Sequence, residues 1–226
     1  MQLREIKKED YQLILDVDKQ IYPTNSPVTP DIIAKWYNNN PEFGLVYEED
    51  GKIVGLSVVI PLNAEGWNQL VEGKISESDL DSKTIFDASR DHELGIHMYH
   101  IEKFEHNALA PIREFYKTVI RDLAVVVNGL KKKHKKLKVI GFSGLAVTKE
   151  GIILCEDKFG CKEGSYVSDE HILKKGNAKI VMKADKTHLK EILEPKVKDG
   201  YSYVTRCKML VSYPNEKSVI WEYIKS

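Results

Sequence analysis

The sequence predicts a protein of the α/β (α+β) class, in which helices cover a mixed central sheet. Apolar residues recur with period two in several short segments and at helical spacing in others, so strands and helices alternate along the chain. The 226 residues are 42% hydrophobic and 30% charged, the composition of a globular chain, and no apolar run is long enough to span a membrane. The expected order is βααββ, an insertion, βαβαβ and a C-terminal β extension.

The first elements are a strand, two helices and a hairpin. A short alternation over Leu3–Ile6 predicts the first strand, which leads into a helix. Thr29-Pro30-Asp31 combines a capping hydroxyl, a proline and an acid, which is typical of a helix start. The Asp50-Gly51 pair predicts a tight turn between two strands, over 43–47 and 53–60.

The middle of the chain supplies an insertion and the longest helix. Residues 61–92 have a weak pattern and are expected to lie over the sheet, whereas 94–104 is β-rich enough for a strand. An unbroken apolar stripe over 111–130 predicts a helix of roughly 30 Å. The near-continuous apolar run 139–147 predicts a strand buried on both faces, followed by a helix over 148–160.

The C-terminal part of the chain is predicted to consist mainly of β-strands. Strands are expected over 161–167 and 178–184, and a short helix over 187–194. The segments 201–213 and 219–224 alternate on either side of a Pro-Asn pair, which predicts a terminal hairpin. Because an isolated two-stranded ribbon is marginal in water, we expect this hairpin to complete the main sheet or to pair across a homodimer.

Composition also indicates the domain organisation and the compartment. No linker or repeat divides the sequence, so we expect one domain over 1–176 with the extension 177–226 packed on it. The three cysteines suit neither a disulfide framework nor a metal site, which favours a reducing compartment. The N-terminal residues lack an apolar run of signal-peptide length, so a cytoplasmic location is expected.

Charge is balanced overall but not along the chain. Lys/Arg and Asp/Glu both number 34, so the formal net charge is zero and the whole molecule has no general attraction for nucleic acid. Residues 1–110 carry 10 basic and 20 acidic side chains, a net of −10, and residues 111–226 carry 24 and 14, a net of +10. This asymmetry either separates a cation site from an anion site or is a bias of the surface.

Three segments carry a resemblance to a known family. They are Asp50-Gly51-Lys52-Ile53-Val54-Gly55, Gly144-Leu145-Ala146-Val147-Thr148 and Cys155-Glu156-Asp157-Lys158-Phe159-Gly160-Cys161. With the order of elements, they make residues 1 to about 167 resemble the GCN5-related N-acetyltransferase (GNAT) superfamily. The resemblance implies that acetyl-CoA or another acyl-CoA binds in a splay between the fourth and fifth strands, and that the loop before the third helix holds the pyrophosphate.

That loop departs from the family motif R/Q-x-x-G-x-G/A. Here it reads Glu105-His106-Asn107-Ala108-Leu109-Ala110, so a carboxylate replaces a cationic or amide residue and Ala108 replaces glycine. A carboxylate repels a pyrophosphate, and a Cβ limits the approach of the backbone. The residues that the resemblance implies for cofactor binding are Ile101, Lys103, His106, Asn107, Ala108, Leu109, Ala110 and Arg113.

In the resemblance, the fourth strand supplies the general base for amine transfer. The candidates here are His97, His100 and Glu102, and an imidazole titrates near neutrality without tuning, so either histidine is the easier base. The alternative is that all three are hydrogen-bonded sheet residues. Without a bulge, strand alternation separates them into two faces: His97, Tyr99 and Ile101 on one, and Met98, His100 and Glu102 on the other.

A general acid for the leaving thiolate is expected on the helix that ends near Gly160. The family usually places a tyrosine there, and the matching residue is Glu156. A buried glutamic acid could protonate a thiolate, whereas an exposed one would be ionised at pH 7.

The run Lys131–Lys138 contains six lysines. It could bind nucleic acid or the 3′-phosphate of CoA, but lysines at a helix C-terminus are also favourable in themselves, and no aromatic residue interleaves them to stack on bases. We therefore expect no nucleic-acid partner. Two functions follow: an N-acetyltransferase acting on a small-molecule or peptide amine, or a non-catalytic GNAT-like module that senses a ligand or binds a protein.

Overall fold

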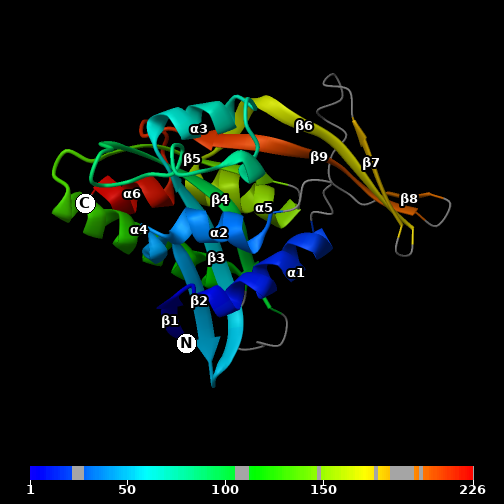
Figure 1. Cartoon of the computed structure of the whole chain (residues 1–226), viewed down its shortest axis with the longest axis horizontal. Coiled ribbons are helices and arrows are strands. Elements are labelled where there is room, and N and C mark those ends of the chain that lie inside the picture. The colour runs from blue at the N-terminus through cyan, green and yellow to red at the C-terminus, as the bar shows by residue number, and fades with distance from the viewer. Residues whose placement is uncertain are drawn as a thin grey trace.

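The computed structural model describes residues 1–21, 28–104, 112–146, 149–175, 178–183, 196–198 and 201–225 (Figure 1). In this part of the chain one mixed sheet has the strand order β1-β2-β3-β4-β5-β9-β6-β7, with β8 paired to β9. The predicted mixed α/β class is therefore confirmed. The strands are β1 Gln2–Glu5, β2 Gly44–Glu49, β3 Lys52–Leu62, β4 Glu93–Lys103, β5 Lys138–Ala146, β6 Lys162–Lys175, β7 Ala178–Lys183, β8 Lys196–Lys198 and β9 Tyr201–Ser212.

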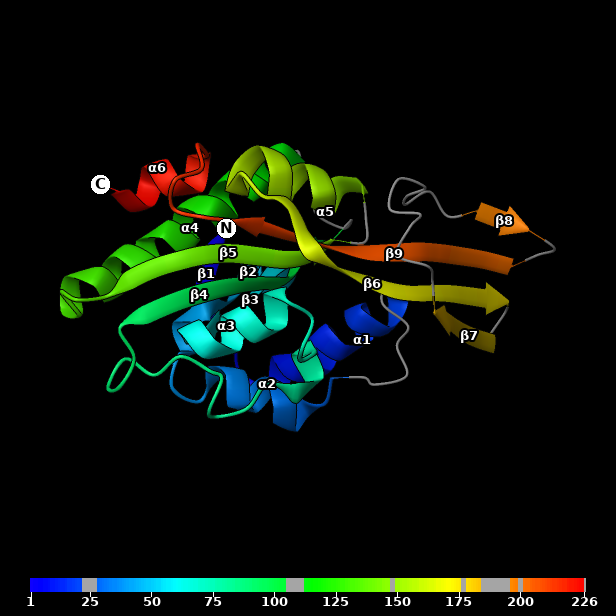
Figure 2. The same ribbon diagram turned by 90° about the horizontal axis from the view of Figure 1, so that it is seen from above.

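Helices lie on both faces of the sheet (Figure 2). One face carries the first three, and the other carries the rest. They are α1 Tyr11–Ile21, α2 Pro30–Tyr37 and α3 Ala64–Val71, then α4 Ile112–Lys133, α5 Lys149–Leu154 and α6 Val219–Lys225, with short turns at Lys8–Asp10, Pro41–Phe43 and Glu77–Asp79 and a π-helical turn at Cys155–Phe159.

The local signals in the sequence correspond to real structure. The Thr29 hydroxyl accepts a hydrogen bond from the Ile32 N–H at the start of α2. Asp50 and Gly51 both have positive φ, 50° and 73°, in the turn between β2 and β3, as a type I′ turn requires. Gly160, with φ 68°, ends the π-helical turn in the left-handed conformation.

Two glycines let α3 pack closely on the sheet. Gly95 and Gly141 lie in the paired strands β4 and β5, and a Cβ at either place would overlap the Trp67 ring. Trp67 is only 2% exposed. Helix α3, within the predicted insertion 61–92, therefore lies over the sheet, whereas Pro61 and Leu62 at the start of that range are the end of β3.

The predicted C-terminal hairpin is wrong in its second half. Tyr201–Ser212 is a strand, β9, but Val219–Lys225 forms helix α6. Alternation and helical spacing cannot be told apart in so short an apolar run, and Ser218, whose hydroxyl accepts from the Trp221 N–H, is a helix-start signal that favours the helix.

The strand β9 lies between β5 and β6 and completes the main sheet. Because β9 is paired along both edges, it does not offer the edge that pairing across a homodimer through a terminal hairpin would use. The helix expected over 187–194 falls outside the described residues.

Candidate functional site

Strands β4 and β5 are hydrogen-bonded to each other along only part of their length. They pair in parallel from Glu93–Lys138 to Met98–Gly144, after which β4 continues to Lys103 while Leu145 and Ala146 of β5 pair with β9. This is the arrangement that the resemblance associates with an acyl-CoA site between these strands.

A β-bulge occupies the point of divergence. The register between β3 and β4 shifts so that Met98 lies opposite Val59 and His100 lies opposite Val58, which leaves Tyr99 as the extra residue. Side chains on β4 therefore do not alternate through this point. The separation of His97 and His100 onto two faces, which was expected only in the absence of a bulge, therefore does not apply here.

The bulge places the three base candidates on one face. His97 is opposite Ile60, His100 opposite Val58 and Glu102 opposite Leu56, and these β3 residues are two apart in sequence. The shared face is the one that α1 and α2 cover (Figure 1).

His97 is held on both sides by hydrogen bonds. The ring is 0% exposed, its Nδ1 is 2.9 Å from the Ser143 Oγ, and its Nε2 is 2.9 Å from a carboxylate oxygen of Glu77. Glu77 belongs to the insertion, so this contact fastens the insertion to β4 and β5. A ring so enclosed has no nitrogen facing a substrate, and the structure gives His97 a structural position.

His100 lies between two carboxylates. Its Nε2 is 3.3 Å from Asp18 Oδ1, and its Nδ1 is 3.8 Å from Glu102 Oε1. The Tyr99 hydroxyl donates to the same Asp18 oxygen at 2.7 Å. Burial disfavours the charged ring, but the hydrogen bonds and charges of Asp18 and Glu102 outweigh it, so the pKa of His100 is raised.

Exposure distinguishes the members of this carboxylate–histidine cluster, which we define as Asp18, Tyr99, His100 and Glu102. The Asp18 and His100 side chains are 6% and 1% exposed, whereas the Glu102 side chain is 31% exposed. With His100 charged, the cluster carries one net negative charge, which suits a cationic group arriving from solvent. Glu102 is the member that such a group can reach.

Sequence reasoning missed Asp18 and the part played by Tyr99. Asp18 follows Ile14 by four residues on the buried stripe of α1, and a carboxylate on an apolar stripe needs a buried partner. That signal could have marked it, although the partner on β4 could not be named.

The predicted general acid is not buried. Glu156 is exposed in the π-helical turn, next to the buried Cys155. The burial that the role of acid requires is therefore absent at this residue.

The structure describes part of the predicted cofactor set. Ile101 and Lys103 are half-buried on β4, opposite Ser57 and Gly55. Arg113 lies in the first turn of α4. The other predicted cofactor residues fall outside the described residues: His106, Asn107, Ala108, Leu109 and Ala110.

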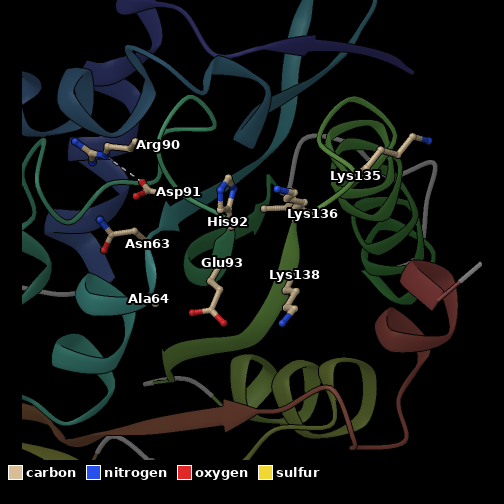
Figure 3. A pocket seen from close by; sticks show the side chains of 10 residues that line it. Asn63, Ala64, Arg90, Asp91, His92, Glu93, Lys135, Lys136 and Lys138 are labelled. Carbon is tan, nitrogen blue, oxygen red and sulfur yellow. Dashed lines mark hydrogen bonds and ion pairs between the residues drawn. The ribbon is translucent and has the colours of Figure 1, made fainter.

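The lysine run lies at the opposite end of the sheet. Lys135, Lys136 and Lys138 line an open pocket of about 680 Å³ beside Glu93, where β4 and β5 begin (Figure 3). Met98 is five positions after Glu93 on β4, a distance of about 17 Å at the rise of a strand. The lysine run is therefore remote from the divergence of the two strands.

The described residues contain no group of three or more His, Cys, Asp or Glu side chains arranged to hold a metal ion. Among them, no helix combines the length and hydropathy needed to cross a membrane.

Comparison with known proteins gives similarity in structure alone. No protein-family model matches the sequence, and no curated protein matches it. The fold resembles that of GNAT proteins. Ard1 from Thermoplasma volcanium is 10% identical, with 94% of this chain and 96% of that chain covered and a TM-score of 0.46.

Two other solved structures are similar to the same extent. Arabidopsis thaliana Naa50, in complex with the bisubstrate analogue CoA-Ac-MVNAL, is 8% identical over 93% of this chain and 97% of that chain, with a TM-score of 0.47. The GNAT-like decarboxylase GphF, in complex with isobutyryl-CoA, is 9% identical over 94% and 99%, with a TM-score of 0.49. At such identities the likeness concerns the fold only.

Proposed function

We propose that the protein is an acyl-CoA-dependent N-acyltransferase that transfers an acetyl group from acetyl-CoA to an amine. The observation that carries the proposal is the end of β4–β5 pairing at Met98–Gly144, with a negatively charged cluster directly beyond it on the face of α1 and α2. The sequence resemblance over residues 1 to about 167 supports the donor, and the cluster supports a cationic acceptor.

The reaction proceeds by direct attack in a ternary complex. Glu102 takes one proton from the acceptor ammonium, and the free amine attacks the thioester carbonyl. The carbon–sulfur bond breaks, an amide forms, and the thiolate takes a proton to leave as CoA. For the whole reaction, R–NH₃⁺ and acyl-S-CoA give the amide, HS-CoA and one proton. Of the two protons that the nitrogen loses, one ends on the leaving thiolate and the other is released to solvent, and Glu102 holds the first of them to leave.

The proposal is tested by following thiol release from acetyl-CoA with a panel of amines. The panel holds peptides with free N-termini, lysine side-chain mimics and polyamines, and CoA binding is measured by calorimetry alongside. We expect Glu102→Gln to lower kcat about a hundredfold, the ordinary contribution of a general base, without changing CoA affinity. The control is Glu93→Gln, an exposed carboxylate at the far end of the same strand.

A non-catalytic GNAT-like module is the second candidate. The enclosed ring of His97, the exposure of Glu156 and the sequence of the loop at 105–110 favour it. A protein that binds CoA or acetyl-CoA but releases no thiol with any amine would support this module and contradict the acyltransferase.

A further inference from the structure

We propose that Asp18 is a positioning residue: it keeps the His100 ring positively charged, and the charged ring holds the Glu102 carboxylate in place to accept the proton of the acceptor amine. This inference rests on the proposed function and extends it to a residue of α1. It also assigns His100 the part of a fixed cation in place of that of a base.

Geometry supports the order Asp18, His100, Glu102. Asp18 Oδ1 lies 3.3 Å from His100 Nε2, and Glu102 Oε1 lies 3.8 Å from His100 Nδ1, so the two carboxylates face opposite sides of one ring. The Asp18 and His100 side chains are 6% and 1% exposed, and Glu102 is the one member of the three that is substantially exposed, at 31%. Only the outer carboxylate can meet a substrate.

The neighbouring charges favour an imidazolium at His100. A carboxylate as buried as Asp18 is costly unless a cation or several donors compensate it. Among the described residues, the Tyr99 hydroxyl and His100 Nε2 both meet Asp18 Oδ1. Asp18 from α1 and Glu102 from the strand of His100 raise the pKa of the ring against the effect of burial.

The position of the cluster connects it with the candidate acyl-CoA site. Tyr99 is the bulged residue immediately after the last β4–β5 pair, and its ring lies edge-on to Trp36 of α2 at 5.0 Å between centroids. The hydroxyl of Tyr99 and the ring of His100 meet on one oxygen of Asp18. Asp18 therefore fixes both the bulge and the charged ring where the strands diverge.

The test compares Asp18→Asn with the unchanged protein in two measurements. Asparagine keeps an oxygen that can accept from the Tyr99 hydroxyl and removes the charge, while Asp16→Asn alters an exposed carboxylate of the same helix as the control. The first measurement is NMR titration of the His100 ring, assigned with His100→Gln. We expect Asp18→Asn to lower the pKa of His100 and Asp16→Asn to leave it unchanged.

The second measurement is the ratio of kcat/KM between variant and unchanged protein across pH, because the ratio cancels the ionisation of the acceptor amine. We expect a ratio near one at pH values where His100 is charged in both proteins, and a fall of about tenfold at alkaline pH, as the loss of one buried neighbouring charge implies. The KM for acetyl-CoA should stay within about twofold, since the cluster acts on the acceptor. His100→Gln should remove the pH dependence of the ratio.

Two results would overturn the inference while leaving the proposed function intact: an unchanged His100 titration in Asp18→Asn, or a ratio that does not vary with pH. If the unchanged protein releases no thiol with any amine, the proposed function fails and the positioning role fails with it. The His100 titration would then show that the ion pair serves the fold alone.

Discussion

At the scale of single residues, one guanidinium group forms hydrogen bonds that connect several N-terminal elements. Arg4 of β1 donates to both carboxylate oxygens of Asp10 at 2.7 and 2.9 Å, and to Glu48 of β2 at 2.6 Å. Asp10 also accepts from the Lys7 N–H. Burial opposes the ionisation of Asp10, but these hydrogen bonds outweigh it and lower its pKa.

Replacing Asp10 by asparagine should destabilise the protein by about 1–3 kcal/mol at pH 7, the usual cost of losing a charged hydrogen-bonded partner. A group with a lowered pKa stabilises the fold above its unfolded pKa, and this contribution is lost as pH falls through the folded pKa. The difference in unfolding free energy between the two proteins should therefore shrink below about pH 4. Urea unfolding over a pH series measures it, with exposed Glu9→Gln as control; a difference that does not change with pH would contradict the account.

Individual residues also mark where sequence reasoning ends. His97, His100 and Glu102 were identifiable as candidates because of their chemical type and their strand. Their common face was not, because a bulge at Tyr99 depends on how two strands pair and has no residue signature here. The partners Glu77 and Asp18 come from separate elements, so only the fold brings them to β4.

At the scale of elements, α3 can pack closely on the sheet only because glycine occupies the facing strand position. Gly95→Ala should place a methyl group within the Trp67 ring and force α3 outward, at a cost of about 1–3 kcal/mol, as overpacking usually does. Gly129→Ala is the matched change, because a Cβ there meets nothing within 4 Å and alanine favours a helix. Thermal unfolding should show the two substitutions acting in opposite directions, and equal effects would contradict this packing.

The C-terminal helix shows why short apolar runs mislead. Local signals such as Asp50-Gly51 and Thr29-Pro30 could be read directly, because each specifies its own backbone geometry. The run 219–224 fits a strand or a helix equally, and its contacts decide: Lys131 and Asn128 of α4 donate to the last carbonyl groups of α6. Such long-range capping cannot be seen in the sequence.

Trp221→Ala should cost about 3–5 kcal/mol, because the indole is 3% exposed, packs on Phe142 at 5.0 Å between ring centroids and donates to the Ser212 hydroxyl at 2.8 Å. Glu222→Ala, at the exposed neighbouring position, should change stability by less than about 0.5 kcal/mol. Chemical denaturation of the two variants measures both effects. Similar small losses in both would show that α6 is only loosely attached.

At the scale of the whole molecule, negatively and positively charged side chains gather at opposite ends of the sheet. The negative cluster lies beyond Met98, where β4 and β5 diverge, and Lys135, Lys136 and Lys138 line part of a pocket where these strands begin. The separation of about 17 Å exceeds the Debye length of about 8 Å at physiological salt. The lysines therefore contribute little to the electrostatic potential at the cluster, because charges this far apart are largely screened.

We accordingly expect the combined replacement of Lys135, Lys136 and Lys138 by glutamine to leave the Kd for CoA within about twofold at 0.15 M salt, since surface charges at this distance are largely screened. Lys103→Gln, on the diverging end of β4, is the contrasting single change, and we expect it to weaken CoA binding severalfold because one cation is lost beside a polyanion. Calorimetry on the three proteins compares them directly. A loss of affinity approaching tenfold in the triple variant would place the cofactor phosphates at the lysine pocket and move the donor site to the opposite end of the sheet.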